Sequence, residues 1–188
     1  MRRDKHRVCP LERAGSLESR LRRWFQNPRR LLSPYVSPGM TVLDIGCGPG
    51  FFTLEMARMV GPGGRVLAVD LQDGMLEKVS RKIAGTALEP RIVLHRCEPD
   101  RLGITDPVDF ALAFWMVHEV PDQPVFFREL AALLRPGARA LIVEPGPFHV
   151  SRDDFAHTLE TARAAGFQTS PGPRLLFCRT ARLTRPAP

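Results

Sequence analysis

The 188-residue sequence contains no run of about 18 apolar residues, so no transmembrane helix is expected. Its basic N-terminus is not followed by the apolar segment of a secretory signal, and a cytoplasmic location is expected. The four cysteines, Cys9, Cys47, Cys97 and Cys178, form neither a Cys-x-x-Cys pair nor a cluster with histidine at zinc spacing. Free thiols in a reducing compartment are the simplest interpretation, and no metal site is predicted.

The formal net charge of +7 is confined to one end of the chain. Residues 1–38 hold ten Arg or Lys and three Asp or Glu, so residues 39–188 are neutral overall. This division predicts a basic N-terminal extension over residues 1–38, followed by one main domain over residues 39–188. A basic arm attracts nucleic acid or acidic partners, but a solvated tail beside the polar face of a helix is the alternative, since charge alone specifies no partner.

From residue 41 onward, short apolar runs alternate with helical patterns. Apolar strands separated by helices predict a mostly parallel sheet with helices on both faces, and the absence of a helix between the last two strands predicts an antiparallel pair. The expected fold is therefore α/β, a Rossmann-like three-layer sandwich with a seven-stranded, mostly parallel sheet and an antiparallel last strand. The predicted strands are 41–45, 65–69, 91–95, 108–114, 140–143, 167–169 and 175–180, and the helices of the domain are 51–60, 75–83, 123–134 and 151–165.

The strongest local signal is the segment VLDIGCGPG at residues 42–50, where a predicted strand enters a glycine turn and a helix leaves it. Glycines permit a tight turn and let a ligand lie against bare backbone, and the N-terminus of the next helix offers free N–H groups. Asp70 ends the second predicted strand, where an acid accepts hydrogen bonds from ribose hydroxyls. Together they predict an adenosine-containing cofactor, although a nicotinamide dinucleotide satisfies the same pattern.

The D-x-G-x-G-x-G pattern of residues 44–50 resembles motif I of the class I S-adenosylmethionine-dependent methyltransferases, especially the type 11/25-like small-molecule group. The resemblance extends over about residues 41–182. Residues 110–122 are similar to the family's fourth strand and following loop, and residues 134–138 to the Leu-x-Pro-Gly-Gly turn before its fifth strand. The resemblance implies S-adenosylmethionine as cofactor and methyl transfer to an acceptor, which is expected to be a small molecule.

By position, the resemblance also implies which residues bind the cofactor. The glycine loop and Asp44 lie against the methionine moiety, and Asp70 holds the ribose. Leu71 and Met75 flank the adenine. The aromatic faces of Phe114 and Trp115 favour the sulfonium. Glu98 accepts from the adenine amino group, although Cys97-Glu98-Pro99 replaces the family's usual Gly-Asp-Ala. Helix or strand capping by the acids and core packing by the aromatics are the alternatives. The cofactor-binding residues so implied are Asp44, Gly46, Cys47, Gly48, Gly50, Asp70, Leu71, Met75, Glu98, Phe114 and Trp115.

Catalysis of methyl transfer mainly requires alignment of the acceptor with an already activated donor, and a general base is needed only if the acceptor must lose a proton. His118 and Glu119 follow the fourth predicted strand and are the candidate catalytic residues, with His118 favoured because its ordinary pKa lies near neutrality. Glu144, at the end of the fifth predicted strand, and His149, in the loop after it, are further candidates for the base. A structural histidine bonded to nearby backbone is an equal interpretation of His118.

Further expectations concern the N-terminal extension and competing functions. Leu17, Leu21, Trp24 and Phe25 share one helical face, which predicts an amphipathic helix that covers the cofactor as a lid, with Tyr35 at the pocket mouth.

Three other functions are alternatives to a small-molecule methyltransferase. They are a nucleic-acid or protein methyltransferase guided by the basic arm, a nicotinamide-dependent oxidoreductase and a non-catalytic relative. No Asn-Pro-Pro-Tyr-type tetrapeptide follows the fourth strand, so resemblance to amino-directed DNA enzymes is lacking.

Overall fold

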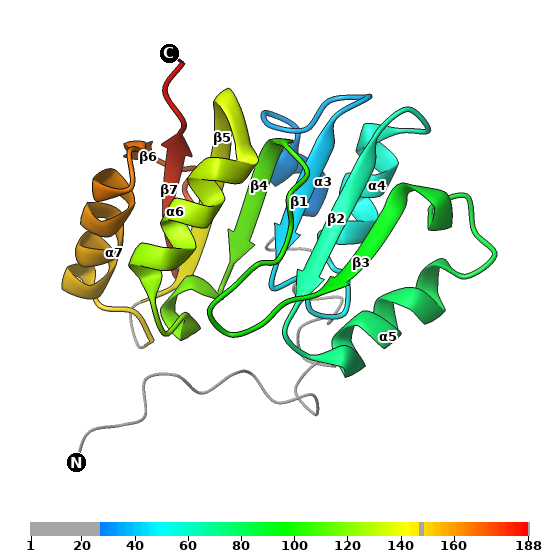
Figure 1. Cartoon of the computed structure of the whole chain (residues 1–188), viewed down its shortest axis with the longest axis horizontal. Helices are drawn as coiled ribbons and strands as arrows, with labels where there is room; N and C mark the ends of the chain where they lie inside the picture. The colour runs from blue at the N-terminus through cyan, green and yellow to red at the C-terminus, as the bar shows by residue number, and fades with distance from the viewer. Residues whose placement is uncertain (1–26, 147–148, 188) are drawn as a thin grey trace.

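The computed structural model describes residues 27–146 and 149–187. Seven strands form one sheet in the order β3-β2-β1-β4-β5-β7-β6. Strands β1 to β5 are mutually parallel, whereas β7 runs antiparallel to both of its neighbours (Figure 1). The strands are β1 (Thr41–Ile45), β2 (Arg65–Asp70), β3 (Ile92–Arg96), β4 (Val108–Phe114), β5 (Leu134–Pro145), β6 (Gln168–Pro171) and β7 (Cys178–Thr184). The predicted α/β, Rossmann-like architecture is confirmed.

Helices cover both faces of the sheet, because successive residues of each central strand point to opposite sides. One core contains buried residues of α3 (Pro28–Leu32), α4 (Thr53–Val60) and α5 (Asp73–Ile83), together with Val42 of β1 and Leu141 of β5. The other contains buried residues of α6 (Gln123–Leu133) and α7 (Arg152–Ala164), together with Leu43 and Ile142. The three-layer arrangement is visible in Figure 1, where α6 and α7 lie in front of the sheet and α3 and α4 behind it.

Local capping explains where several helices begin. Asn27 accepts a hydrogen bond from the backbone N–H of Arg30 at 3.1 Å, and Pro28 occupies the first turn of α3. Ser151 and Asp154 form a capping box at the start of α7. These ends were predictable because the capping contacts are made within four residues of one another.

Several predicted boundaries are wrong, and the errors at three strands have a common cause. Strand β5 begins at Leu134, not at residue 140, because residues 135–137 form an irregularity within an extended strand rather than a turn, and the β4–β5 register shifts between Val108 and Phe110. Strand β7 runs over Cys178–Thr184, not 175–180. Strand β3 is displaced by one residue, to Ile92–Arg96. Each error lies where pairing with a neighbouring strand, rather than local sequence, decides the end of the element.

The N-terminal helix α3 belongs to the packed body of the protein. Leu31, Leu32 and Val36 are buried in the same core as α4. Tyr35 stacks on Phe110, with ring centroids 5.2 Å apart and an interplanar angle of 15°. Phe110 lies near the amino end of β4, so the expectation that Tyr35 reaches the mouth of a site at the carboxyl edge is wrong. The predicted amphipathic helix over residues 17–25 lies outside the described residues.

Candidate functional site

The glycine loop joins β1 to α4 at the carboxyl edge of the sheet, and its three glycines differ in their surroundings. Gly46, Gly48 and Gly50 have φ angles of 67°, 53° and 90°, which residues with side chains rarely adopt. A Cβ atom at Gly46 would lie 3.0 Å from Cβ of Met116, and one at Gly50 would lie 3.1 Å from Cγ2 of Val79. A Cβ atom at Gly48 would meet nothing within 4 Å. A side chain would therefore have room at Gly48 but not at Gly46 or Gly50. The backbone of Gly46 is nevertheless exposed, whereas Gly48 is half-buried and Gly50 buried.

Two side-chain contacts hold this loop in place. Asp44 is buried at the end of β1, and the Thr53 hydroxyl at the start of α4 donates to its Oδ2 at 2.6 Å. Lys82 of α5 donates from Nζ to the carbonyl oxygen of Pro49 at 2.6 Å. Asp44 thus connects the strand to the helix beyond the loop, and its contact with the methionine moiety stays a prediction. Thr53 and Lys82 were not predicted, since nothing in a single sequence relates residues at these spacings to the loop.

Asp70 lies at the end of the neighbouring strand β2 and connects the two loops of the site. Its Oδ2 accepts from the backbone N–H of Gly48 at 2.8 Å, and its Oδ1 accepts from the N–H of Gln72 at 2.9 Å. Burial raises the pKa of Asp70, while the N–H groups of Gln72, Gly48 and Leu71 act to lower it. Each carboxylate oxygen can accept more than one hydrogen bond, so Asp70 retains acceptor capacity for a diol.

Two cysteines flank Asp70 at the same edge. The backbone N–H of Cys47 donates to the Val69 carbonyl at 2.9 Å, and that of Cys97 donates to the Asp70 carbonyl at 3.1 Å. Burial, followed by the charges of Asp44 and Asp70, raises the pKa of the Cys47 thiol well above its usual value. Burial, followed by the charge of Asp70, raises the pKa of Cys97 to about 11. Both remain thiols at neutral pH, so neither is an activated nucleophile.

The residues predicted to contact the adenine lie at the same edge, in different environments. Leu71 is half-buried and follows Asp70 directly. Met75 is fully buried in the first turn of α5. Glu98 is exposed in a tight turn after β3, where its backbone N–H donates to the carbonyl of Arg101 at 3.0 Å. These residues thus follow the carboxyl ends of β2 and β3, and their contacts with adenine stay predictions.

An aromatic row crosses from the glycine loop to the end of β4. Phe51 contacts Phe52, Phe52 contacts Phe114, and Phe114 contacts Trp115, with ring centroids 5.0, 4.6 and 5.2 Å apart. Phe114 is buried in the core, whereas Trp115 is half-buried and has a φ angle of 60°. A positive φ angle on a tryptophan is costly and is typical of residues held in place at functional sites. Core packing therefore accounts for Phe52 and Phe114, and Phe51 and Trp115 are the half-buried members of this row.

The candidate base His118 is held by a buried carboxylate from the neighbouring strand. His118 and Glu119 lie in a short 3₁₀ turn (Val117–Glu119) after β4, and Glu144 lies in β5. Nδ1 of His118 forms a short hydrogen bond with Oε2 of Glu144, and Nε2 of His118 is 3.9 Å from Oε1 of Glu119. Glu144 was predicted as a separate base candidate, and its pairing with His118 was not predicted. The two residues come together because β4 and β5 are neighbouring strands, which only the order of strands in the sheet would have indicated.

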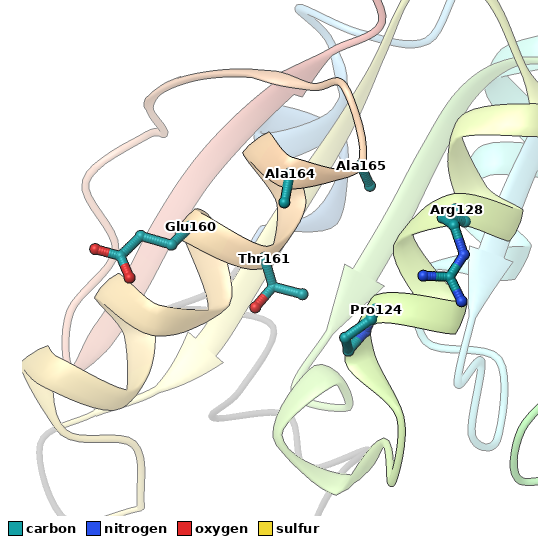
Figure 2. Close-up of a pocket in the computed structure, with 6 residues that line it drawn as sticks. All are labelled: Pro124, Arg128, Glu160, Thr161, Ala164 and Ala165. Carbon is teal, nitrogen blue, oxygen red and sulfur yellow. The ribbon is translucent and has the colours of Figure 1, made fainter.

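Other features of the described residues lie apart from this edge. Among residues 27–146 and 149–187, no three His, Cys, Asp or Glu side chains converge to hold a metal ion, and no helix has the length and apolar character needed to cross a bilayer. A hollow of about 340 Å³ lies between α6 and α7 (Figure 2), lined by Pro124, Arg128, Glu160, Thr161, Ala164 and Ala165. None of its lining residues belongs to the glycine loop, the aromatic row or the histidine pair.

Comparisons with known proteins agree with this geometry. A family model described as a methyltransferase domain matches residues 42–137. A demethylmenaquinone methyltransferase of Symbiobacterium thermophilum is 33% identical over 108 residues, which cover 57% of this chain and 43% of that protein. An arsenite methyltransferase of Halobacterium salinarum is 32% identical over 126 residues, which cover 65% of this chain and 32% of that protein. The chain therefore spans less than half the length of these curated relatives.

The solved structures include a similar protein of matching size. A SAM-dependent methyltransferase from Aquifex aeolicus superposes with a TM-score of 0.84 at 25% identity, and the match covers 95% of this chain and all of that one. The family model covers the segment from β1 to the start of β5, which includes the glycine loop, Asp70 and His118. The chain belongs to the class I S-adenosylmethionine-dependent methyltransferase family.

Proposed function

We propose that this chain is an S-adenosylmethionine-dependent methyltransferase that transfers a methyl group to a small, partly apolar acceptor at the carboxyl edge of the sheet. The observation that carries the proposal is the contact between Asp70 and Gly48 at 2.8 Å, which joins the acid and the open glycine loop into one site. A nicotinamide-dependent oxidoreductase would share a glycine loop and an acid, but family membership favours the methyl donor.

The residues present suit this cofactor. The exposed backbone of Gly46 and the room beside Gly48 suit the amino acid end, and the carboxylate of Asp70 suits the two ribose hydroxyls. When bound, S-adenosylmethionine supplies a methyl group on a sulfonium, which is already an activated electrophile. The protein's own task is therefore to bind, orient and desolvate the reactants, effects that supply up to about 7–11 kcal/mol in favourable intramolecular models. Trp115 would present an aromatic face to the sulfonium.

We further propose that the N-terminal extension, predicted over residues 1–38, covers the bound cofactor as a lid through its part before Asn27. The proposal rests on the apolar helical face predicted for residues 17–25 and on the position of α3, which joins the body of the protein directly after this segment. Leu31 and Leu32 are buried in the core, so a truncation that tests the lid should keep residues from Asn27 onward.

Titration calorimetry with S-adenosylhomocysteine tests both proposals. The full chain is expected to bind this product and to show no comparable affinity for NAD. A chain of residues 27–188 is expected to bind it about tenfold more weakly, since tenfold corresponds to about 1.4 kcal/mol and a closed lid removes bound ligand surface from water. Binding of NAD alone would overturn the methyltransferase proposal, and equal affinity of the two chains would overturn the lid.

An exposed apolar pair supports an acceptor with apolar surface. Leu176 is 64% exposed and Phe177 is 71% exposed, although both are large apolar side chains. The carbonyl of Phe177 accepts from the N–H of Gly146 at 2.9 Å, which ties the pair to the end of β5, two residues beyond Glu144. Phe177 also has a φ angle of 56°, so the loop holds it in an unfavourable conformation. These observations favour direct contact with an apolar acceptor.

Replacement of both residues by serine is expected to raise the KM for an apolar acceptor about tenfold or more, because partial loss of two apolar contacts amounts to about 1.5–3 kcal/mol. The affinity for S-adenosylhomocysteine should not change. Val93→Ser is the matched control, since Val93 is 48% exposed but lies on β3, across the sheet. Equal KM values for the double variant and the control, measured with 1,4-naphthohydroquinone, would contradict an acceptor surface at this loop.

A further inference from the structure

Glu144 is a charged side chain in the interior that binding of the cofactor does not explain. It is 1% exposed, near the end of β5. Its Oε1 accepts from the backbone N–H of Val117 at 2.9 Å, and its Oε2 bonds to Nδ1 of His118. Because the two oxygens bind two different partners, the carboxylate is fixed in orientation. Burial of such a group is costly unless it is paired, so a specific use is indicated.

The pairing determines which nitrogen of His118 carries the proton. A carboxylate only accepts hydrogen bonds, so Nδ1 is the donor to Glu144. In the neutral imidazole Nε2 is then left with a lone pair and can accept a proton. The His118 side chain is 26% exposed, which leaves it within reach of a small molecule. Glu144 thus prepares His118 as a proton acceptor at Nε2.

The position of His118 relates it to the cofactor loop. Met116, two residues earlier in the chain, lies 3.0 Å from where a Cβ atom of Gly46 would be. The loop that carries His118 therefore packs directly against the loop proposed to bind the methionine moiety. An acceptor between the two loops would have the proton acceptor and the methyl donor within one site.

The charged groups around His118 favour its protonated form. Burial acts to lower the pKa of His118, but the hydrogen bond and the charge of Glu144 from β5, with the charge of Glu119 from the same turn, raise it above its ordinary value. A base must be neutral to accept a proton, so activity should rise as the pH increases through this raised pKa.

We infer that Glu144 is a positioning residue that fixes His118 as the general base, and that the methyl acceptor is a protic nucleophile carrying an O–H, N–H or acidic C–H group. The inference rests on the proposed function. The acceptor's proton passes to Nε2 of His118, and the acceptor's electron pair forms the new bond to the methyl carbon. The electrons of the carbon–sulfur bond stay on sulfur, which becomes a neutral thioether. The imidazolium returns its proton to water.

A purely structural Glu144 would hold the Val117–Glu119 turn without affecting the histidine tautomer. Glu144→Gln separates the two roles, since the glutamine oxygen still accepts from Val117 while its amide N–H₂ faces Nδ1. Nδ1 must then accept, and the proton moves to Nε2. Glu129→Gln is the matched control, because Glu129 also accepts from a backbone N–H, that of Leu102 at 2.8 Å, away from this pair.

Nitrogen-15 NMR of histidine-labelled full-length protein measures the tautomer without an acceptor, with His118→Gln used to assign the signals. Wild type and Glu129→Gln are expected to show His118 protonated at Nδ1, whereas Glu144→Gln should show it protonated at Nε2, with the pKa of His118 moved down. An Nε2-protonated wild type, or an unchanged tautomer in Glu144→Gln, would overturn the positioning role. Binding of S-adenosylhomocysteine should be equal in all, so failure of the proposed function is detected separately.

The acceptor class is tested with catechol and 1,4-naphthohydroquinone against trimethylamine and dimethyl sulfide. Only the protic members are expected to be methylated, with kcat lowered about 10²–10⁴-fold in His118→Gln and Glu144→Gln and KM little changed. In wild type, kcat should increase with pH on its acid side. If no protic member is methylated by protein that binds S-adenosylhomocysteine, or if the aprotic members react at rates that His118→Gln leaves unaltered, the inferred class is wrong.

Discussion

Asp70→Ala is expected to raise the Kd for S-adenosylhomocysteine at least about 100-fold. Hydrogen bonds to a charged group contribute about 1.5–3 kcal/mol each, and loss of the two proposed for the ribose hydroxyls removes about 3 kcal/mol or more, where 1.4 kcal/mol corresponds to tenfold. The carboxylate also holds the N–H groups of Gly48 and Gln72. Its removal should therefore loosen the loop at the same time as it removes the ribose contact.

The same substitution should leave the ligand-free protein folded, with an unfolding midpoint close to that of wild type. Burial raises the pKa of Asp70 above its value in the unfolded chain. Because the pKa of Asp70 is higher in the folded state, the protonated carboxyl stabilises the fold at a pH below the pKa of the unfolded chain. This contribution to the free energy of unfolding is lost as the pH rises through the pKa of the folded state. At neutral pH the buried charge therefore costs stability, and its removal offsets the lost hydrogen bonds. Thermal unfolding without ligand measures this separately from binding.

Asp73→Ala is the matched control for Asp70→Ala. Asp73 lies three residues further along the chain, and its exposed carboxylate is 3.5 Å from the guanidinium of Arg96. Exposed ion pairs contribute little, so neither the affinity for S-adenosylhomocysteine nor the stability should change measurably. Equal Kd values for the two variants in calorimetry would show that the carboxylate of Asp70 is not part of a cofactor site.

Gly46→Ala is expected both to destabilise the protein and to abolish detectable cofactor binding. The φ angle of 67° costs a residue with a side chain about 1–2 kcal/mol. The new methyl group would also lie 3.0 Å from Cβ and Cγ of Met116, so one of the two loops must move. Since both loops belong to the proposed site, a shift of either one should disrupt it. Urea unfolding gives the first effect and titration with S-adenosylhomocysteine the second.

Gly61→Ala isolates the backbone contribution. Gly61 has the same φ angle of 67°, but a Cβ atom there would meet nothing within 4 Å. This variant should lose about 1–3 kcal/mol of unfolding free energy, because the ψ angle of −170° places Gly61 in a region that residues with side chains rarely adopt. It should bind S-adenosylhomocysteine like wild type. The double variant Gly46→Ala/Met116→Ala should recover part of the binding, because the clash involves the Met116 side chain. Normal binding by Gly46→Ala would contradict the assignment of this loop to the cofactor.

The site divides into residues that local sequence predicts and residues that it does not. Asp44, the three glycines and Asp70 were predictable, because the strand–loop–helix pattern places them within one connected segment and at one strand end. Thr53 and Lys82 were missed, although both bond to this segment, at 2.6 Å in each case. A hydroxyl in a helix or a lysine on its surface has many possible partners. Only the packing of α4 against β1 and β2, and of α5 against β2 and β3, selects among them.

The acceptor side shows the same limit more strongly. His118 and Glu144 were each predicted as possible bases, but their pairing depends on the parallel register of β4 and β5, which places Phe114 opposite Val143. The boundaries of β7 were wrong for a related reason. Pairing with β5 and β6 decides where it begins, and this leaves Leu176 and Phe177 outside the strand.

The sequence by itself determined the succession of strands and helices along the chain, the caps of α3 and α7, and the glycine loop with its acid. Each of these depends on contacts or conformations within a few residues along the chain. The tertiary structure alone decided what surrounds those residues: which glycine is open, which side chains hold the loop, and which carboxylate faces His118. The Lys82–Pro49 and His118–Glu144 hydrogen bonds join residues 33 and 26 positions apart, and Gly46 and Met116 are farther apart still, so these contacts exist only once the sheet has assembled in one register.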